Sequence, residues 1–383
     1  MNKIIRLSTV PISLNVLLKG QLKFLSNYFN VVAVSGKGVD LEEVAQREEV
    51  RVHSVEMERK VAPVKDFISL VRLYFYFRKE RPVIVHSITP KAGLLSMIAA
   101  KLAGVPIRMH TFTGLIFPSK SGLFQKILIA MDKLLCLCAT NVYPEGQGVS
   151  DDLKSYGITR KPLKVIGNGN VNGIDTKYFD PELYTTEDKI RTRKQLEIFE
   201  NDFVFVFVGR LVKDKGINEL ISAFSKLEAN YKEVKLVLVG PFEDDFDPLD
   251  RETINAIQES KAIVTVGFQQ DVRPYFALAD SLVFPSYREG FPNVVMQAGA
   301  MNLPSIVTDI NGCNEIIREN VNGIIIPVKD SNAIYDAMIK ILTNTEYRNK
   351  LRSNARLHII SRYEQQLVWG ALLEEYKKLE KNV

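Results

Sequence analysis

Residues 203–218 read Phe-Val-Phe-Val-Phe-Val-Gly-Arg-Leu-Val-Lys-Asp-Lys-Gly-Ile-Asn. The first six form a continuous apolar, β-rich run that stops at Gly209, which is typical of a buried strand in a parallel sheet. Arg210 follows at once, and Lys215 stands directly before a helix-length segment. This strand–turn–helix unit predicts a parallel α/β sheet with two cations beyond the carboxyl end of one strand, where such sheets bind ligands.

The pattern repeats through the second half of the chain. Five further apolar runs each stop at a small or turn residue, at 235–239, 263–266, 282–284, 305–307 and 323–326. Helix-length segments such as 218–228 and 333–342 lie between them. Continuous apolar strands that alternate with helices predict a doubly wound α/β domain with both faces of its sheet covered.

The first half repeats this organisation less regularly. Strands are expected at 3–7, 31–34, 83–85, 107–109 and 140–143, and helices at 66–78, 94–103 and 123–137. A polar segment rich in glycine and asparagine, residues 166–175, is a plausible connection between two domains. The sequence therefore predicts two Rossmann-like domains that face each other across a cleft. Their expected extents are residues 1–170 and 171–360, followed at 361–383 by a terminal helix.

Length and composition limit the class of protein. A chain of 383 residues exceeds the usual size of one core, and 46% hydrophobic with 25% charged residues is typical of a soluble globular protein. Neither a transmembrane run nor a signal-peptide pattern is visible, so we expect a cytoplasmic protein. The three cysteines and four histidines lack disulfide or metal-ligand spacing. No metal and no cofactor is therefore expected.

The charge is distributed unevenly along the chain. Residues 1–165 contain 24 Lys and Arg against 13 Asp and Glu, a net charge of +11, whereas the whole chain carries +5. The basic first half favours an anionic partner. No nucleic-acid module is recognisable, so nucleic acid is not the expected partner.

A second segment, residues 286–300, carries candidate ligand groups. Glu289 stands before a glycine and a proline, and a helix-like run follows directly. Pro292 suits the first helical position, and the N–H groups of Asn293 and Val294 would then face a ligand at the positive end of the helix. A carboxylate that accepts hydroxyl groups beside such an end predicts a site for a sugar and a phosphate together.

The two segments together resemble the donor site of retaining glycosyltransferases of family 4, which have the GT-B fold. Arg210 and Lys215 match the Gly-Arg-x4-Lys-Gly element of that family, and Glu289 matches the first glutamate of its Glu-x7-Glu motif. Gln297 stands where the family has the second glutamate. The resemblance implies that Glu289 contacts the transferred sugar and that Gln297 meets the ribose as a neutral partner.

The same resemblance assigns the remaining donor-site residues. The turn Gly267-Phe268 matches the place where backbone groups meet the base, and the loop 308–312 resembles the one that flanks the diphosphate, with Asn311 in place of a glycine. The implied donor-binding residues are Gly209, Gly267, Phe268, Gly290, Phe291, Pro292, Asn293, Val294 and Gln297.

The first half offers one candidate catalytic residue beside Arg210, Lys215 and Glu289. His110 follows a predicted strand, and the resemblance places it near the transferred sugar. A structural role in the core is the alternative, and His86 is expected to be structural. The family often has a second histidine where this chain has Thr113.

The resemblance also implies a function. Relatives that share the wording of residues 87–93 and 111–114 extend capsular or O-antigen polysaccharides on polyprenyl diphosphate carriers. We therefore expect a metal-independent hexosyl- or N-acetylhexosaminyltransferase that retains anomeric configuration, with a UDP-sugar donor and a polyprenyl-diphosphate-linked glycan acceptor. A non-catalytic sugar-nucleotide-binding subunit and a sugar-nucleotide 2-epimerase are the alternatives.

Two features have competing interpretations. The helical segments 66–78 and 123–137 combine cations with aromatic or aliphatic bulk, so they either cover the sheet or contact an anionic membrane at its inner face. Asp245-Phe-Asp247 has the spacing of a metal motif, but it lies in an acidic, proline-containing segment and is expected to be a solvated loop.

Overall fold

The computed structural model describes residues 1–58, 62–243 and 247–382. The chain forms two compact units. Unit 1 consists of residues 1–173 together with the C-terminal segment that begins at Gln365, and unit 2 consists of residues 174–364. The sequence placed these divisions at residues 170 and 361. The acceptor and donor roles that it gave to the two domains stay predictions.

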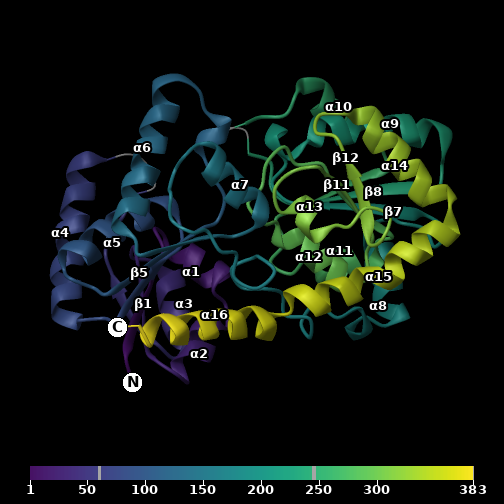
Figure 1. The fold of residues 1–383 in the computed structure, drawn as a ribbon. Coiled ribbons are helices and arrows are strands. Elements are labelled where there is room, and N and C mark those ends of the chain that lie inside the picture. The colour runs from purple at the N-terminus through teal and green to yellow at the C-terminus, as the bar shows by residue number, and fades with distance from the viewer. Residues whose placement is uncertain (59–61, 244–246, 383) are drawn as a thin grey trace. The chain divides into compact units, whose positions relative to one another are not determined.

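Unit 1 is built on a six-stranded parallel sheet, of which β1 and β5 are labelled in Figure 1. The strand order is β3-β2-β1-β4-β5-β6. The strands are β1 Lys3–Leu7, β2 Asn30–Ser35, β3 Arg51–Ser54, β4 Ile84–Ser87, β5 Ile107–Phe112 and β6 Asn141–Pro144. The chain fills one side of β1 first and then crosses to the other side, which is the doubly wound arrangement.

Helices cover both faces of this sheet because its strands are apolar on both sides. Ile5 and Leu7 of β1 belong to a core under α4, α5, α6 and α7, whereas Ile4 belongs to a second core under α1, α2, α3 and the C-terminal α16. The helices are α1 Pro11–Leu17, α2 Gln21–Ser26, α3 Val39–Glu48, α4 Pro63–Glu80, α5 Pro90–Leu102, α6 Gly122–Cys138, α7 Gln147–Ser155 and α16 Gln365–Glu380.

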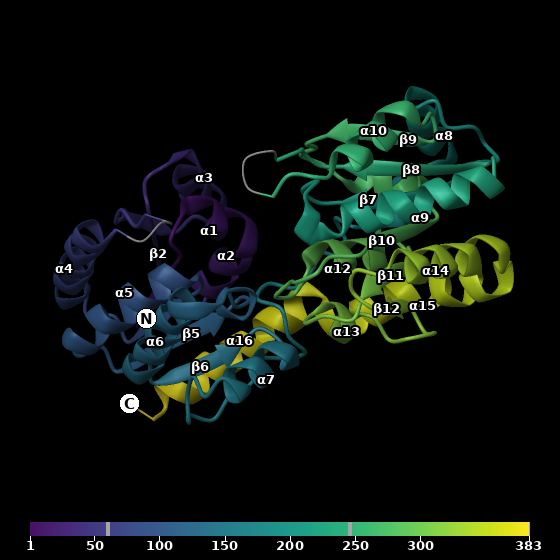
Figure 2. The same ribbon diagram turned by 90° about the horizontal axis from the view of Figure 1, so that it is seen from above.

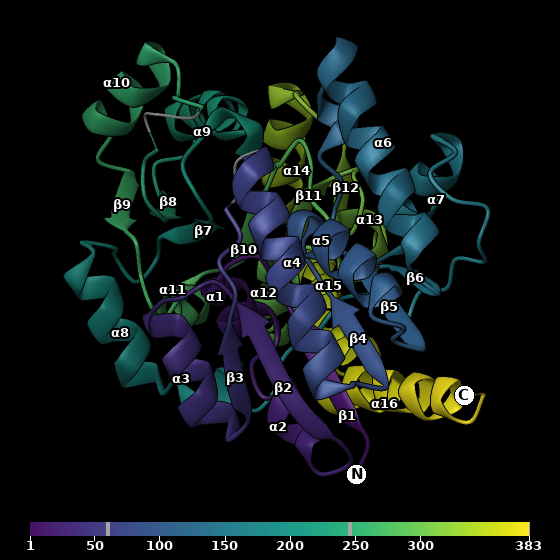
Figure 3. The same ribbon diagram turned by 90° about the vertical axis from the view of Figure 1, so that its left-hand side faces the viewer.

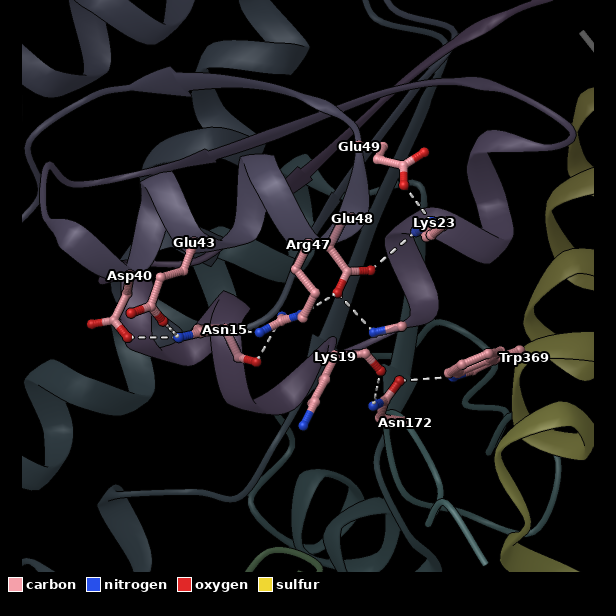
Figure 4. Close-up of polar contacts among 11 residues, drawn as sticks. Asn15, Lys19, Lys23, Asp40, Glu43, Arg47, Glu48, Glu49, Asn172 and Trp369 are labelled. Atoms are coloured by element: carbon pink, nitrogen blue, oxygen red, sulfur yellow. Dashed lines mark hydrogen bonds and ion pairs between the residues drawn. The ribbon is translucent and has the colours of Figure 1, made fainter. Parts of the chain in front are cut away.

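A buried carboxylate holds α2 and α3 together (Figure 4). Glu48, at the end of α3, is fully buried and accepts hydrogen bonds from the backbone N–H groups of Gly20 (2.8 Å) and Lys23 (3.1 Å). These donors belong to the first turn of α2, where N–H groups have no partner within the helix. Beside them the Trp369 indole of α16 donates to Asn172 at 2.7 Å, which fastens the C-terminal helix to the end of the unit 1 chain.

Unit 2 repeats the same architecture with the strand order β12-β11-β10-β7-β8-β9 (Figure 2). Its strands are β7 Phe203–Val208, β8 Val234–Val239, β9 Ile263–Gly267, β10 Ser281–Phe284, β11 Ser305–Thr308 and β12 Gly323–Ile326. Its helices are α8 Thr186–Gln195, α9 Ile217–Asn230, α10 Arg251–Glu259, α11 Arg273–Leu278, α12 Asn293–Ala300, α13 Cys313–Ile316, α14 Ser331–Thr343 and α15 Thr345–Tyr363.

The two sheets confirm the predicted fold class of two doubly wound α/β domains. The predicted ends of two strands were wrong, because β4 and β5 continue two or three residues further, so His86 and His110 lie inside strands. Edge strand β3 was missed because its residues are only half buried and lack a continuous apolar run. Within the described residues, none of the helices combines the length and apolar character needed to cross a bilayer.

Glycine permits the close approach of the two loops that follow β7 and β8. Gly240 has a φ of +146°, and a Cβ atom there would lie 1.8 Å from the carbonyl oxygen of Gly209. No side chain fits this space without a shift of the backbone.

We expect Gly240→Ala to destabilise unit 2 by about 2–5 kcal/mol, because it adds backbone strain to a steric clash. That loss corresponds to at least about 5 °C in melting temperature. Gly267→Ala is the matched control, since Gly267 also has a positive φ, +66°, but open space around it. The Gly267→Ala substitution should cost only the backbone strain, about 1–2 kcal/mol. Thermal unfolding measures the loss of stability in each variant. Equal losses would show that the clash with the Gly209 carbonyl adds nothing to the cost.

Candidate functional site

The loops at one edge of the unit 2 sheet bring the predicted ligand groups together. All six strands run parallel, so their carboxyl ends share this edge. The chain leaves β7 toward β8 on one side and later returns to place β10 on the other side. The loops after β7 and β10 therefore diverge at a topological switch point, where open α/β sheets bind ligands.

An ion pair joins these two loops. The Lys215 ammonium, from the loop after β7, contacts the carboxylate of Glu289, from the loop after β10. Both side chains are largely buried, at 15% and 17% exposure, and the Ser286 hydroxyl donates to the same carboxylate at 3.0 Å. The switch point thus holds a cation and an acceptor side by side, in an environment with little water to screen them.

Backbone contacts at two glycines bring three loops to this point. A Cβ atom on Gly216, which precedes α9, would lie 2.1 Å from the carbonyl oxygen of Pro285. A Cβ atom on Gly312, which precedes α13, would lie 2.5 Å from the carbonyl oxygen of Gly290. Both glycines have positive φ angles, so the backbone conformation favours glycine at these positions, as does the lack of room for a side chain.

Tyr287 and Arg288 fix the loop that carries Glu289. The Tyr287 backbone N–H donates to the Asp214 carbonyl at 2.8 Å, and its hydroxyl donates to the Glu219 carboxylate at 2.6 Å. Burial, reinforced by Glu219, raises the pKa of the Tyr287 hydroxyl, which keeps it a neutral donor. Arg288 pairs with the Asp214 carboxylate at 2.9 Å.

Arg210 lies at the same edge, and about half of its side chain is exposed. Its guanidinium pairs with the carboxylate of Glu243 at 2.7 Å, from the loop after β8. An anionic ligand would compete with Glu243 for this cation. Asp245 and Phe246, from the predicted solvated loop, lie outside the described residues, whereas Asp247 accepts the Asp214 backbone N–H at 2.6 Å.

Helix α12 begins one residue later than the sequence predicts. Pro292 has a ψ of 110° and is the residue that precedes the helix, so Asn293 is its first residue. Phe291 is buried and packs against the ring of Tyr363, with 5.5 Å between ring centroids. Gln297 is half buried on the second turn of α12. The assignment of these residues to a donor site stays a prediction.

Gly267 and Phe268 stand apart from the switch point. Gly267 ends β9 and Phe268 follows it, and β9 is separated from β7 by β8. The Phe268 ring is 76% exposed, and Gly267 has a φ of +66°. That backbone groups of this turn meet the base stays a prediction.

His110 is buried in unit 1, within β5. It is 1% exposed, and its Nδ1 atom lies 2.9 Å from the Ser87 hydroxyl. Gly93 of α5 lies directly against the ring, because a Cβ atom there would be 2.4 Å from the His110 Cε1 atom. Burial lowers the pKa of His110 to about 3, so the ring stays neutral at physiological pH. Its predicted role at the transferred sugar is not tested by this geometry.

His86 has the expected structural position. Its ring is buried, with the Thr111 hydroxyl at 2.8 Å and the Tyr376 hydroxyl at 2.6 Å. Tyr376 belongs to α16, so this histidine connects the sheet to the C-terminal helix. Burial lowers the pKa of His86 well below its usual value.

Sequence reasoning missed the residues that support the site. Ser286 and Glu243 contact the predicted Glu289 and Arg210, and Asp214 and Glu219 hold Arg288 and Tyr287 of the same loop, but no motif in this chain marked these four residues. Two of them lay within segments that the sequence singled out, Ser286 at the start of the one that carries Glu289 and Asp214 between Arg210 and Lys215. In the part of the chain that the structure describes, no group of three or more His, Cys, Asp or Glu side chains is arranged to hold a metal ion.

The chain is similar to known proteins along most of its length. Residues 188–358 match the family model of glycosyl transferases group 1, and residues 29–169 match the glycosyl transferase 4-like domain. The capsular polysaccharide biosynthesis glycosyltransferase CapM of Staphylococcus aureus is 31% identical over 380 residues, which are 98% of this chain and 96% of that protein.

Two further comparisons extend this similarity. An Escherichia coli protein, UDP-Gal:alpha-D-GlcNAc-diphosphoundecaprenol alpha-1,3-galactosyltransferase, is 28% identical over 79% of this chain and 77% of its own length. The crystal structure of HepE from Anabaena, in complex with UDP and glucose, superposes with a TM-score of 0.82 at 17% identity, over 99% of this chain and 100% of that one. The last comparison shows a shared fold.

The buried His110 predicts acid sensitivity. The unfolded chain binds a proton at this ring below pH 6.5, whereas the folded protein binds it only near pH 3, so folding stability falls as pH drops through this window. The loss is about 1.4 kcal/mol per pH unit. We expect the stability of His110→Asn to depend less steeply on pH than that of the wild type. Thermal unfolding between roughly pH 7.5 and pH 5 measures this difference.

Ser87→Ala is the control for this prediction. It removes the hydrogen bond to His110 but keeps the titrating ring, so its pH dependence should stay as steep as in wild type. If His110→Asn and wild type lose stability in parallel, the ring is protonated in the folded protein and the burial argument is wrong.

Proposed function

We propose a specific reaction for this chain, which belongs to the GT-B glycosyltransferases. Its first domain is a glycosyl transferase 4-like domain and its second is a glycosyl transferases group 1 domain. The protein transfers a hexosyl or N-acetylhexosaminyl group, with retention of anomeric configuration, from a UDP-sugar to a lipid-linked glycan acceptor. The product belongs to a capsular or O-antigen surface polysaccharide.

The observation that carries this proposal is the ion pair between Lys215 and Glu289 at the switch point of unit 2. When a nucleoside diphosphate leaves a sugar carbon, negative charge builds on the phosphate and the sugar becomes cation-like. Lys215, Arg210 and the N–H groups at the start of α12 supply fixed positive charge for the leaving phosphate. Glu289 supplies an acceptor for the sugar hydroxyls.

The contacts of Glu289 favour an orienting role over nucleophilic attack. Lys215 and the Ser286 hydroxyl already engage its carboxylate, so its lone pairs are directed by two donors. A double displacement needs a free carboxylate at the anomeric carbon. In the proposed reaction a phosphate oxygen of the leaving group takes the proton of the acceptor hydroxyl. The reaction requires no divalent metal ion, because Lys215, Arg210 and the N–H groups at the start of α12 stabilise the diphosphate.

The relatives support the donor and acceptor classes. The Escherichia coli galactosyltransferase is named for a UDP-sugar donor and a diphosphoundecaprenol-linked acceptor. A Campylobacter jejuni relative, 25% identical over 78% of this chain, is named as an N-acetylgalactosaminyltransferase that acts on a diphospho-undecaprenol-linked sugar. By this similarity we infer a polyprenyl-diphosphate-linked acceptor, met by a cytoplasmic enzyme at the inner face of the membrane.

A non-catalytic sugar-nucleotide-binding subunit is the second candidate. Gln297 favours it, because a neutral amide replaces the carboxylate expected beside the ribose. Donor binding without transfer would support this candidate, and conversion of a UDP-sugar to its 2-epimer would support the third class, the epimerases.

Donor binding should raise thermal stability and depend on Arg210. We expect one UDP-sugar from a panel of UDP-, GDP-, ADP- and TDP-sugars to stabilise the wild type by about 2.7 kcal/mol at a hundredfold excess over Kd. Arg210→Ala should abolish most of this shift. Lys213→Ala is the matched control, because Lys213 lies on the same loop but pairs with Asp250 at the surface. A wild-type shift that Arg210→Ala retains would contradict the assigned diphosphate site.

Transfer should depend on both partners of the ion pair. We expect Lys215→Ala to lower kcat by roughly 10²–10³, because it removes one group that stabilises the transition state. Glu289→Gln keeps the shape but loses the charged acceptor, and it should lower kcat without abolishing the donor-induced shift. Product analysis by NMR reports the anomeric configuration. Inversion in the wild-type product would overturn the proposed retaining mechanism, and loss of rate on chelation would overturn its metal independence.

A further inference from the structure

Helices α4 and α6 of unit 1 carry large apolar side chains on the face turned away from the sheet. On each helix these residues are one, three or seven positions apart, which places them on one side of the helix as a stripe. Separate residues fill the core beneath, with Leu73 and Phe77 on α4 and Leu135 on α6. The outer stripes are therefore not needed to cover the sheet. They consist of Val64, Phe67, Ile68 and Phe75 on α4, and Leu123, Phe124, Ile127, Leu134 and Leu137 on α6.

The two stripes belong to one surface. Both helices pack against α5, whose residues are mostly buried between them (Figure 3). Each helix runs back against the direction of the parallel strands, so the first turns of α4 and α6 lie at the carboxyl edge of the unit 1 sheet. The exposed apolar residues are densest there, and Phe67 and Leu123 are 67% and 75% exposed.

This surface, here named the α4–α6 face, is also cationic. Its exposed basic residues are Lys65, Arg72, Arg78 and Lys79 on α4, and Lys126 and Lys133 on α6.

None of the carboxylates on α4 and α6, all of whose residues the structure describes, is exposed. Asp66 pairs with Lys91 at 2.8 Å, and Glu80 pairs with Lys3 at 2.7 Å. Asp132 is partly buried, and this burial raises its pKa to about 7. Lys65 pairs with the carboxylate of Glu58, which precedes α4. The face therefore combines apolar bulk with an excess of positive charge.

Unit 2 shows that the fold does not demand such a face. In the shared strand order, α11 and α13 occupy the places that α4 and α6 occupy in unit 1. They have 6 and 4 residues, against 18 and 17, and none of those described residues is a large exposed apolar one. The long, apolar and basic helices are a property of unit 1 beyond its architecture.

We propose that the α4–α6 face docks onto an anionic lipid bilayer. The apolar residues enter the boundary between headgroups and acyl chains, and the six cations contact lipid phosphates, which is the pattern of interfacial amphipathic helices. A second copy of the chain fits this face poorly, since a twofold contact would place the same cations against one another. The proposal rests on the proposed function in one respect, because a lipid-linked acceptor would then arrive at the carboxyl edge of unit 1.

Co-sedimentation with lipid vesicles tests this surface without donor or acceptor. We expect the wild type to bind vesicles that contain phosphatidylglycerol. Its binding to pure phosphatidylcholine vesicles should be weaker by about tenfold or more. The triple variant Phe67→Ser, Leu123→Ser, Phe124→Ser should lose binding. Lys126→Glu with Lys133→Glu should weaken binding to the anionic vesicles by about 25-fold or more, at about fivefold per charge.

The matched control changes apolar residues of unit 2 that are exposed to a similar degree. Ile190→Ser with Phe199→Ser, at 54% and 74% exposure, should bind vesicles like the wild type. Every substituted residue is exposed, and unchanged melting temperatures will confirm that each variant folds.

Three results would overturn the proposal. They are no vesicle binding by the wild type, equal binding by the wild type and the triple variant, and a wild-type dimer that the triple variant converts to a monomer while neither binds vesicles. The proposed function is judged separately by the donor-induced thermal shift. A shift without vesicle binding leaves the glycosyltransferase assignment intact, and vesicle binding without a shift leaves the α4–α6 face intact.

Discussion

The adjacency of β7 and β10 is the constraint on which the candidate site depends. In the sequence, 72 residues separate Val208 at the end of β7 from Ser281 at the start of β10. Only the doubly wound order makes them neighbours and places Lys215 beside Glu289. Gly216 and Gly312 then let the backbones approach closely enough for the short contacts to form. The charge pair is thus a product of topology first and of side-chain chemistry second.

The site is organised by counter-charges. Lys215 is held by Glu289, Arg210 by Glu243, and Arg288 by Asp214. Each cation has a defined position before any ligand arrives, which reduces the reorganisation that an anionic ligand must cause. The same arrangement means that a diphosphate gains less than the full attraction of each cation, since it displaces or shares an existing partner. Arg210 and Arg288 are the more accessible of the three cations, because about half of each side chain meets solvent, whereas Lys215 is largely buried.

Much of the fold could be predicted because it depends on local apolar runs. Phe203–Val208 and Gly323–Ile326 are strands with the predicted ends, since each is bounded by residues that stop a strand. Edge strand β3 and the short helices α1 and α2 could not be predicted, because long-range packing and the buried Glu48 stabilise them.

The site divides in the same way. Lys215 and Glu289 were found from motif spacing and are in contact. Glu219 and Glu243 were missed, because a carboxylate on a helix or loop has no local signal that names its partner across the sheet. Pro292 was placed one position too far into its helix, since proline is compatible with both the first helical residue and the one before it.

The C-terminal helix gives the chain an order of assembly. Unit 2 is continuous, and its two ends meet where the Ile174 N–H donates to the Tyr363 carbonyl at 2.7 Å. Unit 1 is discontinuous, because α16 supplies Tyr376 to the core beside His86 and Trp369 to Asn172. A ribosome that synthesises the chain from the N-terminus therefore releases all of unit 2 before the last helix of unit 1. The first domain to be translated is the last that can be completed, and its six-stranded sheet must wait with one face covered only by α1, α2 and α3.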